Sequence, residues 1–203
     1  MLVDKLKDYD ILLASTSPRR KQLLAEMGLS FRTLKKAVEE KFPAGLSPTE
    51  ATVYLSRLKS LVFHNDELKE NTLLITADTI VCLDSKILGK PKDEKEAREI
   101  LQQLSSKKHE VITGISLRIK DRIHSFFATT DVYFKSLSNE EINYYIKHYQ
   151  PFDKAGAYGI QEWIGHTAIE KIEGSYYNVM GLPTYRLYNE LESFIDGQNK
   201  NTL

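Results

Sequence analysis

The chain has 203 residues, enough for one domain or two small lobes whose core needs no disulfide or metal to hold it. Its 28 basic and 28 acidic side chains cancel, which argues against a nucleic acid polymer as the main partner, because such proteins carry a basic excess. The single cysteine, Cys82, excludes an internal disulfide and a zinc cluster. Without a signal peptide or a long apolar run, we expect a cytoplasmic chain with no membrane partner.

Residues 11–20 predict a strand that turns directly into a helix. The apolar run Ile11–Leu13 ends in hydroxyl side chains. Ser17 suits a helix N-cap, Pro18 suits the first helical position, and Gly28 can end the helix in a left-handed conformation. The helix is therefore expected to begin where the hydroxyls are.

Two adjacent cations, Arg19 and Arg20, follow at a helix end that is already positive, where cations are unfavourable unless an anion lies opposite. Arg20 is in helical phase with the apolar residues at 23, 24 and 27, so we expect its guanidinium at the carboxyl edge of the sheet. Such a helix end could receive a polyphosphate. A capped surface helix with solvated arginines is the alternative, and this stretch alone leaves both open.

Residues 31–46 predict a strand followed by a loop with two adjacent carboxylates, Glu39 and Glu40. Ser47 and Pro48 then begin a second helix. Lys59 lies at the margin of its apolar face, where a lysine ordinarily extends to water. The apolar face expected from the helical period consists of Ala51, Tyr54, Leu55, Leu58 and Val62.

The segment 72–83 predicts a strand that is buried on both faces, yet it carries one carboxylate, Asp78. Burying an unpaired carboxylate costs on the order of several kcal/mol, so Asp78 must be protonated, paired or bound to a metal. A structural pair with an arginine is one interpretation. We favour a functional one, because strand interiors seldom carry Asp.

A turn at 89–91 holds Lys90 in an extended conformation before a proline, and a helix follows from Asp93. Segments 110–119 and 122–134 predict a β-hairpin, after which a capping box begins another helix.

The segment 151–165 combines three glycines with aromatic and polar side chains, which would let the backbone approach a ligand closely. Its spacing matches neither a Walker A loop nor a dinucleotide fingerprint, and a tight structural loop explains it equally well. A short strand near 168–172 and a final helix that ends at Gly197 follow, with Leu187, Tyr188, Leu191, Phe194 and Ile195 expected on its buried face.

Because the hairpin interrupts an alternation of strands and helices, we expect an α/β fold with a mixed sheet flanked by helices. Residues 1–203 would form a single domain with two lobes around a cleft, between which the sequence marks no boundary.

Six blocks in a fixed order carry a resemblance that none of them carries alone. They are residues 13–20, 77–79, 89–91, His109 with 113–114, 153–161 and 174–183. Together they resemble the Maf family from about Ile11 to the final helix. The resemblance implies a fold like that of the inosine triphosphate pyrophosphatases and a homodimer. It also implies a pyrophosphatase that cleaves a nucleoside triphosphate between the α and β phosphates with Mg²⁺ or Mn²⁺.

The resemblance also assigns roles to single residues. Asp78 matches the general base that activates the attacking water, and Glu40 matches an acidic position that would hold the metal together with Asp78. Glu39 precedes Glu40, which leaves open which of the two carboxylates approaches the metal.

Arg19, Thr79 and Gln161 match positions associated with base specificity, in the combination of the branch that acts on dTTP and UTP. The polar positions around the triphosphate are matched by Ser15, Ser17, Arg20, Lys59 and Lys90.

Two other functions stay open at this point: a housekeeping pyrophosphatase for modified nucleotides, and a nucleotide-sensing protein linked to cell division that needs no turnover. The presence of Asp78, Glu40 and both lysines argues against the second. A serine hydrolase with Ser15 or Ser17 as nucleophile lacks the G-x-S-x-G elbow.

Overall fold

The computed structural model describes residues 1–197, which fall into two compact units. Unit 1 holds residues 1–78, 113–128 and 181–197, and unit 2 holds 79–112 and 129–180. Strands β3 (Thr72–Leu83), β5 (Lys108–Ile119) and β6 (Arg122–Phe134) contribute residues to both units. Both parallel and antiparallel strand pairs occur, so the predicted mixed sheet is confirmed.

In unit 1 the short strand β1 (Asp10–Leu13) lies parallel to β3 on one side and to β2 (Arg32–Thr33) on the other. The strand predicted within 31–46 is thus only two residues long. Because Leu13 at the end of β1 pairs with Ile75, the turn after β1 lies beside the middle of β3, where the amide of Ala14 donates to the carbonyl of Ile75 at 2.9 Å.

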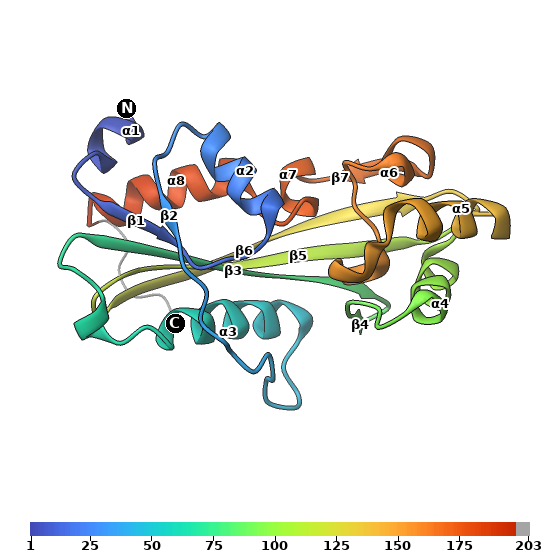
Figure 1. Ribbon diagram of the computed structural model, residues 1–203, viewed down its shortest axis with the longest axis horizontal. Helices are drawn as coiled ribbons and strands as arrows, with labels where there is room; N and C mark the ends of the chain where they lie inside the picture. The colour runs from blue at the N-terminus through green and yellow to red at the C-terminus, as the bar shows by residue number, and fades with distance from the viewer. Residues whose placement is uncertain (198–203) are drawn as a thin grey trace. The chain divides into compact units, whose positions relative to one another are not determined.

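Helices cover both faces of the unit 1 strands, with α3 on one face and α2 and α8 on the other (Figure 1). Helix α1 was not predicted from the sequence, and it packs against α8. In α8, Tyr188 and Ile195 are half-buried instead of buried, whereas Leu187, Leu191 and Phe194 form the buried face as predicted. The bounds are α1 Leu2–Leu6, α2 Pro18–Glu26, α3 Pro48–Leu61, the 3-10 turn η1 Asn65–Glu67 and α8 Thr184–Ile195.

The buried face of α3 differs from the prediction because β5 comes unusually close to the helix. Tyr54 is 39% exposed, whereas Thr52, Ser56 and Ser60 are fully buried. A Cβ atom on Gly114 of β5 would lie 2.4 Å from the carbonyl oxygen of Thr52. Only small side chains fit such an approach, so small hydroxyl residues replace the expected larger ones on this face.

Hydrogen bonds fix α3 against the sheet along its length. Thr76 of β3 donates to the carbonyl of Ser56 at 2.7 Å, and the hydroxyls of Ser56 and Ser116 lie 3.0 Å apart. At the end of the helix, the buried Arg118 of β5 donates to the carbonyls of Ser60 at 2.6 Å and Phe63 at 2.8 Å. A cation at a helix C-terminus satisfies carbonyls that have no partner within the helix.

Unit 2 contains residues 79–83 of β3, 108–112 of β5 and 129–134 of β6. It also contains β4 and β7, which pair antiparallel with β3 and β6, respectively. Helix α4 packs against α5 and the 3-10 turn η3. The predicted hairpin β5–β6 is present, whereas β4 and α7 were not predicted. The bounds are β4 Lys86–Leu88, α4 Glu94–Leu104, α5 Asn139–Tyr149, η2 Pro151–Asp153, η3 Ala155–Ala157, α6 Trp163–Thr167, β7 Ile169–Glu173 and α7 Tyr176–Val179.

The glycine-rich segment 151–165 packs tightly against its own unit. Gly156 has φ +72°, and a Cβ atom there would lie 2.7 Å from a methyl carbon of Val81. Its amide donates to the carbonyl of Gly89 at 3.1 Å. This contact fixes the turn that carries Lys90, so at Gly156 the tight structural loop is what the structure supports.

A buried aromatic cluster forms part of the unit 2 core. His109 is 1% exposed, and its ring meets Phe134 and Tyr158 edge-on at centroid distances of 5.1 and 5.5 Å. Its Nε2 atom lies 2.8 Å from the Tyr158 hydroxyl. Burial lowers the pKa of His109 from 6.5 to about 4, so the ring is neutral at pH 7.

Among residues 1–197, no helix is both long and apolar enough to cross a lipid bilayer.

The close approach of β5 and α3 predicts the effect of a single methyl group. Gly114→Ala should lower the free energy of unfolding in urea by about 1–3 kcal/mol, because the added carbon overpacks the contact with Thr52. Gly89→Ala is the matched control, since a Cβ atom there meets nothing within 4 Å. Equal stabilities of the two variants would contradict the account of α3 packing.

The buried imidazole predicts acid sensitivity. Because the folded pKa of His109 lies near 4 and the unfolded value is 6.5, the unfolded state takes up the proton first. His109 therefore costs the folded state up to about 3 kcal/mol as the pH falls from 6.5 to 4. His109→Gln should flatten the unfolding free energy measured in urea over that interval. An unchanged dependence of the unfolding free energy on pH would show that other groups cause the loss of stability in acid.

Candidate active site

The turn from β1 into α2 has the predicted capping geometry. Ser17 is the N-cap, and its hydroxyl accepts a hydrogen bond from the amide of Arg20 at 3.4 Å. Ser15 is buried, and its hydroxyl accepts from the amide of Ser17 at 3.2 Å. Both hydroxyls therefore shape the positive end of α2, with Pro18 as the first helical residue.

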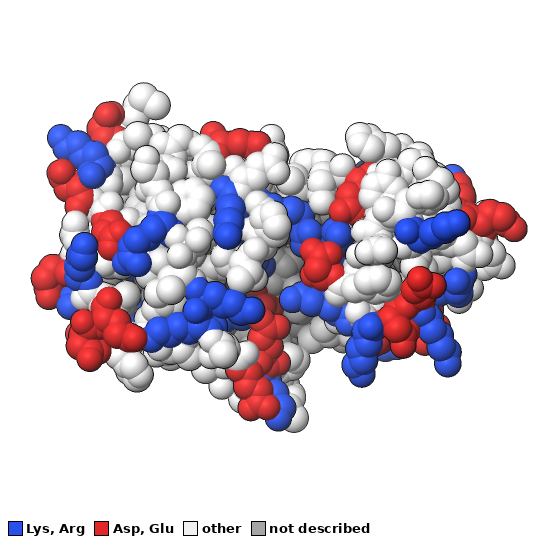
Figure 2. Space-filling model, viewed as in Figure 1, with Lys and Arg blue, Asp and Glu red and all other residues white. Residues whose placement is uncertain are grey.

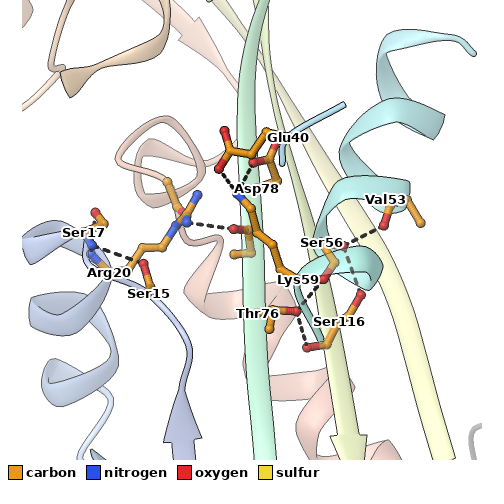
Figure 3. A network of polar contacts seen from close by, with 12 residues as sticks. Ser15, Ser17, Arg20, Glu40, Val53, Ser56, Lys59, Thr76, Asp78 and Ser116 are labelled. Atoms are coloured by element: carbon orange, nitrogen blue, oxygen red, sulfur yellow. Dashed lines mark hydrogen bonds and ion pairs between the residues drawn. The ribbon is translucent and has the colours of Figure 1, made fainter. Parts of the chain in front are cut away.

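Arg20 reaches from α2 to the middle of β3 (Figure 3). Its Nη1 atom donates to the carbonyl of Ala77 and its Nε atom to the carbonyl of Gly181, both at 2.8 Å. Burial lowers the pKa of the guanidinium and Arg19 acts in the same direction, whereas Asp78 and Glu40 oppose them. Two carbonyls therefore hold the guanidinium in place, one of them from the middle of β3.

Asp78 is paired with a lysine. Lys59 of α3 donates to the Asp78 Oδ1 atom at 2.6 Å, and its Nζ atom also lies 2.7 Å from the Oε1 atom of Glu40 (Figure 3). The Asp78 side chain is 9% exposed and that of Lys59 is 16% exposed. The expectation that Lys59 extends to water was therefore wrong, because a buried carboxylate on the adjacent strand binds its ammonium group.

The structure distinguishes the two adjacent glutamates. Glu40 shares Lys59 with Asp78, whereas the side chain of Glu39 is 73% exposed and pairs with Lys41. Glu40 is therefore the carboxylate that lies beside Asp78.

Two carboxylates that contact one ammonium group form a donor set that also suits a hard divalent cation. Among the described residues, no group of three or more His, Cys, Asp or Glu side chains surrounds a possible metal position. A cation held by Asp78 and Glu40 would need further oxygen ligands from water or from a bound anion, as is usual for Mg²⁺. The residues present fit a metal that binds together with a phosphorylated ligand.

The remaining predicted site residues belong to unit 2. Thr79 directly follows Asp78 in β3 and is half-buried, and Lys90 is exposed in the turn after β4. Gln161 lies between η3 and α6, where its amide nitrogen is 3.5 Å from the Oε1 atom of Glu162. Seven of the ten predicted residues thus lie in unit 1, and these three are in unit 2.

Sequence reasoning missed the neighbours of Gln161. Glu162 accepts a hydrogen bond from Tyr145 and lies 3.1 Å from the Nζ atom of Lys154. The sequence contained one signal for these neighbours, because Lys154 is a charged residue beside a run of small residues. In the structure Lys154 is only 7% exposed, which is rare for a lysine without a partner.

Basic and acidic side chains lie interspersed on the face shown in Figure 2, in keeping with the balanced charge. The N-terminus of a helix favours anions, and carboxylate oxygens favour a hard divalent cation, so this arrangement suits a phosphorylated ligand that binds together with a metal ion. The chain belongs to the Maf family, since the model of the Maf-like proteins matches residues 10–194.

Similar proteins from three organisms share the name dTTP/UTP pyrophosphatase. The relative from Porphyromonas gingivalis is 49% identical over 197 residues, which cover 95% of this chain and 98% of the relative. The relative from Cytophaga hutchinsonii is 47% identical over 97% of this chain and 89% of its own length. The relative from Bacteroides thetaiotaomicron is 49% identical over 94% of this chain and 99% of its own length.

Among solved structures, the Ham1 protein of Staphylococcus aureus aligns with 62% of this chain and 71% of its own, at 15% identity and a TM-score of 0.43.

The pairing of Lys59 with Asp78 predicts a strong effect on stability. Lys59→Met should lower the free energy of unfolding by about 3 kcal/mol at pH 7, because it leaves a buried carboxylate without its ammonium partner. The double variant Lys59→Met with Asp78→Asn should recover at least half of that loss in the same urea titration. A double variant no more stable than Lys59→Met would show that an unpaired Asp78 carboxylate does not destabilise the fold.

Proposed function

We propose that the chain is a nucleoside triphosphate pyrophosphatase that hydrolyses dTTP and UTP to the nucleoside monophosphate and pyrophosphate. The observation that carries the proposal is the buried Asp78 beside Glu40, Lys59 and Arg20, at the positive end of α2. The names of relatives that are 47–49% identical over nearly the whole chain support the same activity and the same bases.

The reaction needs a base for water and positive charge for a polyphosphate. Asp78 takes a proton from a water molecule, which attacks one of the two phosphorus atoms of the α–β anhydride. The bond between that phosphorus and the bridging oxygen breaks, and the bridging oxygen leaves with the other phosphoryl group. Asp78 and Glu40 would hold Mg²⁺ or Mn²⁺, which neutralises phosphate charge and polarises the anhydride when bound.

The cations supply the electrostatic stabilisation that an anhydride cleavage requires. The residues proposed to bind the triphosphate are Ser15, Ser17, Arg20, Lys59 and Lys90. Lys59 changes partners in this scheme, because its ammonium contacts both carboxylates in the structure and would contact a phosphate when the metal is bound. Arg19, Thr79 and Gln161 are proposed to distinguish the base. A homodimer and a cytoplasmic location stay predictions of the sequence.

A nucleotide panel with product analysis tests the proposal. With Mg²⁺ or Mn²⁺ present, pyrophosphate release from dTTP and UTP should exceed that from dCTP, CTP and GTP, and chelation with EDTA should abolish it. Asp78→Asn should lower kcat by about 10²–10⁴-fold, the usual contribution of a general base. Asp131→Asn serves as a control, because that carboxylate pairs with Lys108 and has no role in the proposed reaction.

Three results would contradict the proposal in different ways. Orthophosphate as the product would place the cleavage elsewhere, equal rates across the panel would remove the base specificity, and near-normal turnover by Asp78→Asn would remove Asp78 from the mechanism. A clear preference for 5-substituted uridine triphosphates over UTP would instead favour the clearance of modified nucleotides.

A further inference from the structure

The amide of Gln161 has one end bound and one end available. Its Nε2 atom lies 3.5 Å from the Oε1 atom of Glu162. Its Oε1 atom is buried and has no hydrogen-bond partner among the described residues. A buried carbonyl oxygen without a donor is unfavourable, which makes this atom a candidate acceptor for a ligand.

The carboxylate of Glu162 is fixed from both sides by residues of unit 2. The Tyr145 hydroxyl accepts a hydrogen bond from the amide of Gly159 at 3.0 Å and donates its own proton to the Oε2 atom of Glu162. Burial and the hydrogen bond to Glu162 both raise the pKa of Tyr145, so this proton stays on the phenol. The Nζ atom of Lys154 lies 3.1 Å from the Oε1 atom of Glu162.

These contacts determine which way the Gln161 amide faces. An ionised carboxylate only accepts hydrogen bonds, so the Oε1 atom of Glu162 can be approached by the NH₂ end of the amide and not by its oxygen. Gly159 makes room for this arrangement, since a Cβ atom there would lie 2.9 Å from both the Gln161 Nε2 atom and the Glu162 Cδ atom. The amide oxygen is therefore directed away from Glu162.

We propose that Glu162, held by Lys154 and Tyr145, is a positioning residue that orients the Gln161 amide so that its oxygen accepts a hydrogen bond from the ring N3–H of uracil or thymine. Neutral uracil and thymine carry a donor at N3, whereas cytosine carries a lone pair there and would face the amide oxygen with a second acceptor. This inference rests on the proposed function, because it assumes a pyrimidine nucleotide as substrate.

The test compares kcat/KM for UTP with kcat/KM for CTP. Glu162→Met removes both acceptor oxygens at similar volume, and Lys154 keeps a partner because Asp153 lies 2.8 Å from it. The amide of Gln161 can then turn its NH₂ group toward the base, so the UTP/CTP ratio should fall at least tenfold. Glu162→Gln is the conservative control, since its amide oxygen can still accept from Lys154 and Gln161, and it should keep most of the preference.

A second comparison separates positioning from a general loss of structure. Gln161→Met should itself remove most of the preference, and Glu162→Met should cause no further fall in the ratio when Gln161→Met is already present. An equal fall in both backgrounds would show that Glu162 does not act through Gln161 and would overturn the inference. If Glu162→Met does not fold, Tyr145→Phe takes its place, with a severalfold fall in the ratio expected and an unchanged ratio overturning the proposal.

Failure of this inference and failure of the proposed function give different results. A wild-type protein that turns over UTP and CTP equally well, or neither of them, would contradict the proposed function. A wild-type protein that prefers UTP, together with a Glu162→Met variant that keeps the full preference, would overturn only the role of Glu162.

Discussion

A single buried carboxylate constrains the structure of unit 1. Asp78 lies in a strand that is buried on both faces, and it is stable there only with a cation beside it. The cation comes from α3, so the helix must be held close to β3 and in one rotation about its axis. Gly114 allows the close approach, and Arg118 fixes the end of the helix. Much of the packing between α3 and the sheet therefore determines where one ammonium group lies.

The elements that could be predicted are those with a strong local signal. The bounds of β3 and the N-cap of α2 match the prediction, because apolar runs and capping residues act over a few positions. The requirement for a partner at Asp78 was also predictable, since burial of a charge has the same cost in any fold. The identity of that partner was not, because Lys59 lies nineteen positions away and local periodicity placed it at the edge of a helix face.

The missed features depend on contacts between segments that are distant in sequence. Tyr54 fits the apolar period of α3 but is exposed, because the approach of β5 selects small residues for the buried face. Periodicity also could not separate Glu39 from Glu40, since neighbouring side chains in an irregular loop have no fixed direction. The environment of Gln161 depends on Glu162 and, through it, on Tyr145 of α5, and Gln161 itself could be recognised only through the family resemblance.

The two proposed recognition tasks need different degrees of order. A polyphosphate is attracted by cations over several ångströms and from many directions, so lysines and arginines can bind it with only moderate precision. A base is distinguished by the direction of single donors and acceptors, and a glutamine amide presents either kind depending on a rotation of 180°. A lone amide would therefore accept uracil and cytosine alike. Lys154 and Tyr145 hold Glu162, and Glu162 orients the Gln161 amide. This arrangement removes that ambiguity, which gives a physical reason for placing a buried lysine and a half-buried glutamate near a neutral residue.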